Sequence, residues 1–598
     1  MKKIVGFCKE LSFSCSLLFR ANGFLFLLYI LIRIVMATLP ILKLYVFNLI
    51  INSLVTGTNT KQVFVYMICF ITCIIFTPIA ENIFNILYRD MNEKMINTYE
   101  VSVNEKLARM PMAFLDSGTG RNIIDDVIDA RNTVCTFFFK VEHVINQLYV
   151  FIVSIVVLMK YNLLLTLLFL VFTIPGAIFR NYSDVLIYSW NLKSAPDVRK
   201  FSYYRWMLTD PWPSKDVRMY NLTNDIKKRY KQEKGEYLYK KKKLSKKGLN
   251  LGYISTIIAQ FGILLYTLYI IVDAYEGEIT IGEIGFYSGL AITTLSAFGE
   301  IISMMINFFS LSLKRFESCF SFFAEKNEND YFTTNIQSME INFEELEFRN
   351  VYFKYPFTKD YILKGISFKI CKGDRLSIVG VNGSGKTTII KLILGLYLPD
   401  KGQIMLNGKN ITEYNLNDIR NMFSVIFQTY VSYPLTVREN VALSDLKNIN
   451  NDELIEKALF KSNFAEKCSD YSKGIETYLT RQFDDEGEEL SKGQWQKIAL
   501  ARTYFKNASI IIFDEPSAAL DVEAENKVFE DYKNLSVEKT SIMISHRMSG
   551  VTISNKILVI DDGTIVESGN HEELVGRSGI YAKLYNMQKA KYIREGEA

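Results

Sequence analysis

Six long apolar stretches fill most of the N-terminal half of the 598-residue chain. A helix crosses the hydrocarbon core of a bilayer with about 17 to 25 residues, and each stretch is long enough to do so. The mean hydropathy of only +0.09 shows that the rest of the chain is much more polar. The sequence therefore predicts an α-helical domain with six membrane spans, at residues 23–54, 63–87, 143–160, 163–180, 251–273 and 284–313.

The links between these stretches are of two kinds. Those near 55–62, 161–162 and 274–283 are short and nearly free of Lys and Arg, whereas those near 88–142 and 181–250 are long and basic. Because basic links stay on the cytoplasmic side of a membrane, we expect the long links, the N-terminus and the C-terminal domain to be cytoplasmic. The lysine run within 240–243 is interpreted as a solvated face near anionic lipid, in preference to a nucleic-acid site.

Two short segments inside the long links interrupt the helical pattern with proline, glycine and aromatic residues. They are MPMAFLDSGTG (110–120) and TDPWPSKDVRMYN (209–221). Since 25 helical residues extend a span by nearly 40 Å, at about 1.5 Å per residue, we expect these segments to be the tips of helices that leave the membrane. At the N-terminus, Lys9 and Glu10 interrupt the apolar run that a signal peptide needs, which favours an interfacial helix.

The C-terminal part of the chain has a different character. A polar linker without helical periodicity, residues 326–345, separates the membrane domain of residues 1–325 from residues 346–598, which alternate β-branched strands, glycine turns and charged helices. That alternation predicts an α/β domain.

A glycine-rich loop in this domain matches the pattern GxxxxGK[ST] and lies between an apolar strand and a helix, in RLSIVGVNGSGKTTIIKLILGLY (375–397). Backbone N–H groups of such a loop converge on phosphate oxygens, the lysine adds a positive charge, and the threonine hydroxyl suits Mg²⁺. We therefore expect ATP to be bound by Gly380, Asn382, Gly383, Ser384, Gly385, Lys386, Thr387 and Thr388.

Further candidate residues follow apolar strands. Asp514 closes the strand in SIIIFDEPSAALD and is placed to hold Mg²⁺ together with Thr387 and Gln428, while Glu515 is next in line to polarise a water. His546, one of three histidines, also ends a strand, and Tyr355 precedes the glycine-rich loop, where it could stack on a nucleobase. Taken singly, a carboxylate pair at a strand end is more often a structural cap, and a histidine there is more often a solvated loop residue. The order of all these residues along the sequence is what indicates a nucleotide site.

The segment LSKGQ (490–494) is expected to begin a helix whose N–H groups, with the Ser491 hydroxyl, form an anion site. The glycine-rich loop has no obvious arginine finger of its own. A second anion site therefore suggests that the γ-phosphate is covered by another copy of the domain, so that ATP would join two subunits.

Together these residues resemble an ABC exporter half-transporter, in which one six-helix membrane domain of the type I exporter kind is fused to one P-loop NTPase domain. The resemblance implies ATP-driven transport by a dimer, with Gly380–Thr387 as the Walker A loop and Glu515 as the catalytic base. It also implies the remaining roles: Tyr355 for adenine stacking, Gln428 and Asp514 for Mg²⁺ and water, Ser491, Gly493 and Gln494 for the signature, Asp521 for the D-loop and His546 for the switch. Lys492 departs from the family, which usually has glycine there; we expect its side chain to point to solvent.

The finer resemblance is to exporters of ribosomally made peptides, especially lantibiotic transporters of the bacterial plasma membrane. It is carried by LSKGQWQKIALARTYFKNASIIIFDEPSAALD, FQTYVSYPLTVRENVALSDL and LTDPWPSKDVRMYNLTNDIKKRY. Some peptide exporters carry an N-terminal cysteine-peptidase domain that removes leaders. We expect no such domain ahead of the first span here, so that a leader would be removed elsewhere, and we expect peptide-modifying enzymes among the partners. A multidrug exporter, a lipid flippase and an ATP-gated channel or sensor remain alternatives. Arg33, Glu81 and Glu300 lie inside the spans, where we expect each to face a cavity or a partner. The alternatives are an ion pair between helices and a side chain that snorkels to a nearby interface.

Overall fold

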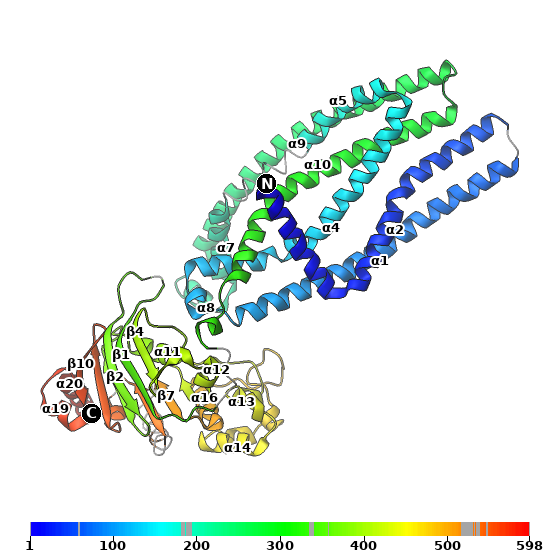
Figure 1. Cartoon of the computed structure of the whole chain (residues 1–598). Coiled ribbons are helices and arrows are strands. Elements are labelled where there is room, and N and C mark those ends of the chain that lie inside the picture. The colour runs from blue at the N-terminus through cyan, green and yellow to red at the C-terminus, as the bar shows by residue number, and fades with distance from the viewer. Residues whose placement is uncertain are drawn as a thin grey trace. The chain divides into compact units, whose positions relative to one another are not determined.

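The computed structural model describes residues 2–57, 60–180, 186, 190, 194–333, 340–356, 358–515, 530, 533, 539–545 and 548–596. The chain divides into two compact units (Figure 1). The first unit comprises residues 1–105 and 123–324, and the second comprises 106–122 and 325–598.

Long helices make up the first unit. They are α1 (Lys2–Val55), α2 (Thr60–Leu107), α4 (Gly118–Tyr161), α5 (Leu163–Arg180), α7 (Ala195–Thr209), α8 (Pro211–Met219), α9 (Thr223–Tyr275) and α10 (Ile281–Ala324). Five of them are long and apolar enough to cross a membrane, namely α1, α2, α4, α9 and α10, and α5 carries a shorter apolar segment, Leu163–Ile174. Each of the six expected stretches therefore lies on a helix. Figure 1 shows α5 and α9 side by side, as their contacts require.

Helix α1 is interrupted at Asn22, whose backbone is extended (φ −174°, ψ 101°). The Asn22 side chain accepts hydrogen bonds from the N–H groups of Phe24 and Leu25, at 3.1 and 3.2 Å, and so caps the helix that follows. Residues 2–21 thus form a separate helix ahead of the first span.

Both expected tips are confirmed as breaks between helices. At the first, α2 ends at Leu107, the short helix α3 covers Met112–Leu115, and α4 begins at Gly118. At the second, α7 ends at Thr209, and the Asp210 carboxylate caps α8 by accepting a hydrogen bond from the Trp212 N–H at 2.9 Å.

The second unit contains two sheets. One has the strand order β2-β1-β4-β5, formed by β1 (Glu345–Phe353), β2 (Leu363–Cys371), β4 (Lys401–Leu406) and β5 (Lys409–Asn410), and its described pairings are antiparallel. The other has the order β10-β9-β3-β8-β7-β6, formed by β3 (Arg375–Gly380), β6 (Phe423–Ile426), β7 (Ile510–Asp514), β8 (Thr540–Ile544), β9 (Lys556–Asp561) and β10 (Thr564–Gly569). Strands β9, β3, β8, β7 and β6 are parallel, so their carboxyl ends share one edge, which is where open α/β sheets bind ligands.

The helices of this unit are short. They are α11 (Lys386–Ile393), α12 (Leu416–Asn421), α13 (Val437–Ala442), α14 (Asp452–Lys461), α15 (Ala465–Ser469), α16 (Lys492–Lys506), α18 (Met548–Val551), α19 (His571–Gly576) and α20 (Ile580–Gly596). Aliphatic side chains of both sheets and α11 form one buried core. A second cluster, around the fully buried Phe464, joins α13, α14 and α16.

The expected linker is anchored at its start. Residues Glu328–Tyr331 form a 3-10 turn, and the Glu328 carboxylate accepts two hydrogen bonds from the Arg420 guanidinium, at 2.8 and 3.0 Å. The Glu328 N–H donates to the Arg109 carbonyl at 2.7 Å, and the Lys106 ammonium donates to the Glu325 carbonyl and to the Asn327 side chain.

The first tip packs onto the same unit. Met112 and Ala113 contact its hydrophobic core, and the Tyr397 hydroxyl donates a hydrogen bond to the Asp116 carboxylate. This explains why residues 106–122 group with the second unit although they lie between two membrane spans in sequence.

Candidate nucleotide site

The glycine-rich loop leaves β3 at the centre of the parallel sheet and enters α11. Gly380 has no room for a side chain, because a Cβ there would lie 2.1 Å from the carbonyl oxygen of Ile560 on the adjacent β9. Gly383 and Gly385 adopt φ angles of 83° and 101°, in the left-handed region that glycine tolerates. The loop therefore has the tight backbone that a phosphate-binding turn needs.

The Lys386 side chain is folded back into this loop. Its ammonium donates to the carbonyl oxygens of Gly380 and Val381, at 3.0 and 2.9 Å, and burial lowers its pKa. The buried Ser384 hydroxyl has no hydrogen-bond partner among the described residues. An unsatisfied hydroxyl beside a buried ammonium fits an anion such as a nucleotide phosphate.

Asp514 closes β7 beside the loop, and its side chain is 1% exposed. The Thr387 hydroxyl donates to its carboxylate at 3.2 Å. Burial raises the pKa of Asp514 to about 6, against the lowering effect of the hydrogen bond from Thr387 and of the Lys386 charge. Because burial penalises the negative charge, a divalent cation would stabilise it, and the pairing of a hydroxyl with a carboxylate is a donor set suited to Mg²⁺.

Glu515 follows directly and has a strained backbone, with φ 51° in a residue other than glycine. Its N–H donates to the carbonyl of Ile544 at the end of β8, at 3.0 Å. Its carboxylate accepts a hydrogen bond from the Gln428 side chain at 2.8 Å. Gln428 after β6, Glu515 after β7 and Ile544 at the end of β8 therefore lie together, as we expect of residues that follow neighbouring parallel strands.

The signature segment begins α16 as expected. Ser491 is the N-cap: its hydroxyl accepts from the Gln494 N–H at 3.3 Å, and the Gln494 side chain accepts from the Ser491 N–H at 2.8 Å. Ser491, Lys492 and Gly493 are exposed, and a Cβ at Gly493 would meet no atom within 4 Å. The Lys492 ammonium makes no hydrogen bond or ion pair with the described residues, in agreement with the expectation that it points to solvent.

Tyr430 connects the glutamine loop to this turn. Tyr430 follows Gln428 by two residues, and its hydroxyl donates to the backbone carbonyl of Lys492 at 2.7 Å. The sequence analysis did not identify Tyr430, because a tyrosine in a loop carries no signal of its partner 62 residues away.

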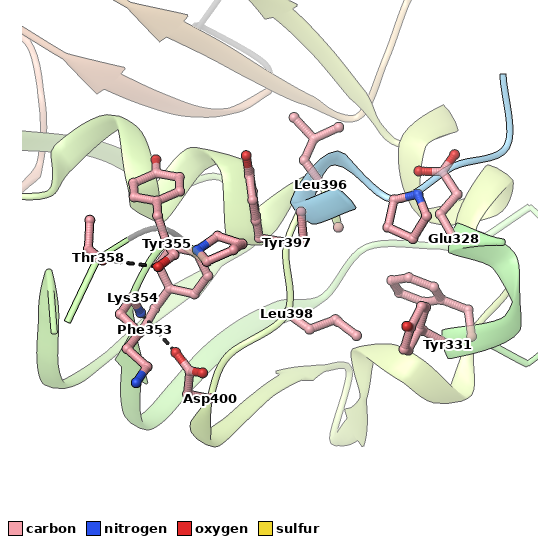
Figure 2. A pocket seen from close by; sticks show the side chains of 15 residues that line it. Glu328, Tyr331, Phe353, Lys354, Tyr355, Thr358, Leu396, Tyr397, Leu398 and Asp400 are labelled. Atoms are coloured by element: carbon pink, nitrogen blue, oxygen red, sulfur yellow. Dashed lines mark hydrogen bonds between the residues drawn. The ribbon is translucent and has the colours of Figure 1, made fainter. Parts of the chain in front are cut away.

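Tyr355 lies at the end of β1, with its hydroxyl 3.2 Å from that of Thr388 and 3.3 Å from the Lys391 ammonium. Its ring meets those of Phe353 and Tyr397 edge to face. Figure 2 shows the adjoining cavity of about 340 Å³, which Tyr355 and Tyr397 line together with Tyr331 and Glu328 of the linker. The expected D-loop and switch residues, Asp521 and His546, lie outside the described residues.

The charged residues inside the spans have different environments. Arg33 forms an ion pair with Glu142 at 2.8 Å, and Glu300 contacts His143 at 2.8 Å. Glu81 is exposed and makes no hydrogen bond or ion pair with the described residues. The sequence analysis named neither Glu142 nor His143, which lie at the boundary of an expected span.

Comparison with known proteins finds similarity to ABC transporter proteins in both units. Residues 363–518 match the ABC transporter family. The chain is 29% identical to the subtilin transport ATP-binding protein SpaT of Bacillus subtilis, over 98% of this chain and 95% of that protein. It is 27% identical to the nisin transport ATP-binding protein NisT of Lactococcus lactis, over 93% and 92% of the two chains.

Two further similarities concern the ATP-binding domain and the fold. An ATP-dependent lipid A-core flippase of Xylella fastidiosa is 37% identical over 243 residues, 41% of this chain and 40% of that protein. The solved structure of a bacterial Atm1-family ABC exporter with ATP bound has a TM-score of 0.75 and 20% identity, and the similarity covers 95% of this chain and 99% of that one. Residues 363–518 thus belong to an ABC transporter ATP-binding domain, which is fused to a helical multi-pass transmembrane domain in an ABC exporter fold. Such an ATP-binding domain implies hydrolysis of ATP coupled to transport.

Proposed function

We propose that the protein exports a ribosomally made, lanthipeptide-like peptide from the cytoplasm across the bacterial plasma membrane. The observation that carries this proposal is the similarity to the subtilin and nisin transport proteins, which extends over more than 90% of each chain and so includes the membrane domain. The membrane domain is the part that contacts cargo, and similarity confined to an ATP-binding domain does not specify a substrate.

We further propose how the site residues hydrolyse ATP. The loop Gly380–Thr387 would bind the phosphates, and Lys386 would exchange its two carbonyl partners for β- and γ-phosphate oxygens. Mg²⁺ held by Thr387, Asp514 and Gln428 would neutralise charge on the phosphates. The Glu515 carboxylate, oriented by the hydrogen bond from Gln428, would accept a proton from the attacking water.

Two copies of the chain would form the working unit. Ser491 and Gly493 are exposed at the first turn of α16, whose N–H groups and dipole favour an anion. In a head-to-tail dimer this turn would cover the γ-phosphate bound by the other copy, so ATP would close the two domains and hydrolysis would release them. Asp521 and His546 would complete the site, and the ATP-binding domain and the N-terminus would be cytoplasmic.

The proposal is tested by ATP hydrolysis in lipid vesicles, with and without a leader-bearing precursor peptide, and with Glu515→Gln as the blank. We expect the peptide to stimulate the wild type at low concentration. The blank should bind ATP but lose turnover by a factor of roughly 100 to 10,000, which is what a positioned general base contributes. Near-normal hydrolysis by Glu515→Gln would contradict the role of this residue, and activity indifferent to peptide would contradict the cargo.

A lipid flippase is the second candidate, because an ATP-binding domain of the same kind, 37% identical in a lipid A-core flippase, also serves membrane domains with other cargo. Stimulation of the wild type by lipids or hydrophobic drugs, with no response to the peptide, would favour a flippase or a multidrug exporter of the same architecture.

A further inference from the structure

A chain of polar contacts crosses the interior of the first unit. It starts at Glu142 on α4, whose carboxylate accepts from the Tyr29 hydroxyl at 2.9 Å and from the Arg33 Nε at 2.8 Å. Both Tyr29 and Arg33 are on α1. A second nitrogen of Arg33, Nη2, lies 2.7 Å from the Nδ1 of His143, whose Nε2 lies 2.8 Å from Glu300 on α10. Three spans are therefore joined by side chains that are costly to place in lipid.

The donors in this chain determine the protonation state of His143. Arg33 carries only donors, so the Nδ1 of His143 must accept the hydrogen bond from Nη2. The ring proton is then on Nε2, which donates to the Glu300 carboxylate. The Gln147 amide nitrogen lies 3.5 Å from Nε2, but it donates to the same carboxylate, at 2.5 Å, and not to the ring. A second proton on Nδ1 would point at a guanidinium only 2.7 Å away. His143 is therefore held as a neutral ring between two charged groups.

Counting charges along the chain leaves one carboxylate without a compensating cation. Arg33 is matched by Glu142, with side chains that are 15% and 14% exposed. Glu300 receives hydrogen bonds from neutral His143 and neutral Gln147, at 2.8 and 2.5 Å, and these are its partners among the described residues. Both bonds reach the same oxygen, Oε2. The other oxygen belongs to a side chain that is 51% exposed.

We propose that Glu300 is a binding site for a cationic side chain of the cargo, a lysine ammonium or an arginine guanidinium. This inference rests on the proposed peptide-export function and names the residue that selects for positive charge. Gln147 and His143 orient the carboxylate, and Arg33 keeps His143 from neutralising it. A charged group inside a span faces water or a partner rather than acyl chains, so the exposed oxygen of Glu300 is available to a cation that reaches it.

The other end of the contact chain offers a complementary surface. Arg33 and Glu142 lie in the wall of a cavity of about 480 Å³ between α1 and α4. Most of its remaining wall is apolar, with Ile30, Ile34 and Phe138 among the lining residues. Because Arg33 and Glu142 already neutralise each other, this cavity suits apolar side chains rather than a second charge. A peptide that alternates lysines with apolar residues fits both features.

The test uses the full-length dimer in vesicles and two synthetic precursor peptides, one with free lysines and one with acetylated lysines. Acetylation removes the lysine charge. In the wild type we expect acetylation to raise the peptide concentration that gives half-maximal ATPase stimulation about tenfold, the size of one charge-assisted hydrogen bond at a partly exposed site. In Glu300→Gln, which keeps an acceptor oxygen, the two peptides should differ less than about threefold.

Glu317→Gln is the matched control, because it removes the same charge from an exposed position on the same helix. It should keep the tenfold preference for the free lysines, as should Glu300→Asp, which guards against a folding defect caused by the substitution. A preference that persists in Glu300→Gln, or is absent from the wild type although both peptides stimulate it, overturns the inference and leaves the export function intact. A wild type that responds to neither peptide overturns the export function as well.

A spectroscopic measurement tests the contact chain independently of transport. The protein has three histidines, so the nitrogen resonances of His143 are assigned by comparison with a His143→Gln variant. We expect the neutral tautomer protonated at Nε2 near neutral pH. In Arg33→Gln the glutamine amide can either donate to Nδ1 or accept from it, so we expect both ring tautomers to be populated. A His143 that is already protonated at neutral pH in the wild type would contradict the charge count.

Discussion

The pair between Arg420 and Glu328 provides a quantitative test of how the linker is attached. Two hydrogen bonds of 2.8 and 3.0 Å join the guanidinium to the carboxylate, and the side chains are 30% and 19% exposed. The same Glu328 donates its N–H to Arg109, so the pair also holds the first tip. Arg420→Gln removes the charge and the bidentate geometry without placing a bulky group at the site.

The expected size follows from these contacts. Hydrogen bonds to charged groups contribute about 1.5–3 kcal/mol each, but partial exposure screens them and the two bonds share one pair of side chains. A net contribution of about 2 kcal/mol is therefore reasonable for the pair, and it corresponds to roughly a 25-fold change in a local opening equilibrium. The opening in question is detachment of residues 326–333 from the rest of the second unit.

Hydrogen exchange measures that opening directly. The N–H groups of Glu328 and Thr333 donate to the carbonyls of Arg109 and Thr412, which lie outside the segment, so their exchange reports its attachment. We expect Arg420→Gln to speed their exchange by about 10- to 30-fold. Arg438→Gln is the control, because Arg438 pairs with Asp452 and Glu476 and makes no hydrogen bond or ion pair with the described residues 326–333. Unchanged exchange in Arg420→Gln, or equal acceleration in the control, would refute the reasoning.

Three further predictions concern the loop, the signature turn and the N-terminal helix. In the nucleotide-free protein, Gly380→Ala should lower the free energy of unfolding by about 3 kcal/mol or more, because its Cβ would lie 2.1 Å from a strand carbonyl. Gly383→Ala should lower it by only about 1–2 kcal/mol, because its positive φ is the one obstacle to a side chain. Denaturant unfolding that ranks the two variants in the opposite order would contradict this prediction. Tyr430→Phe removes the hydrogen bond to Lys492 and should lower ATP turnover about fivefold without weakening ATP binding, as steady-state kinetics and nucleotide titration would measure. Burial and the nearby Glu317 raise the pKa of Glu10 to about 7, so its ionisation lowers the stability of the fold as pH rises from about 4.5 through 7. In thermal unfolding, Glu10→Gln should therefore stabilise the protein by about 2–3 kcal/mol at pH 8 and by less than about 1 kcal/mol at pH 5. An equal gain at both pH values would exclude ionisation as the cause.

The nucleotide site is the part that sequence predicts best. Gly380, Lys386, Thr387 and Asp514 belong to motifs whose spacing is tied to strand ends, and parallel strands bring those ends together. The contact of Gln428 with Glu515 follows from the same rule, since β6 and β7 are neighbours.

Contacts that depend on helix packing could not be predicted in this way. Helical periodicity gives the face on which Arg33 or Glu300 lies, but it does not say that Glu142 and His143, more than 100 residues from each, face them. Residues 326–345 were interpreted as a linker because they are polar and lack a helical period. Its polar residue Glu328 is what attaches it, through Arg420.

The grouping of residues 106–122 with the ATP-binding unit has a consequence for recombination between transporters. A gene fusion that joins the membrane domain of one exporter to the ATP-binding domain of another at residue 325 would separate Asp116 from Tyr397, and Met112 from the core on which it packs. The exchangeable module is thus discontinuous, and a working chimaera would have to inherit two stretches of the gene about 200 codons apart. An ATP-binding domain expressed alone from residue 325 would expose the apolar surface under Met112 and Ala113, and we expect it to self-associate unless that short segment is supplied as a peptide.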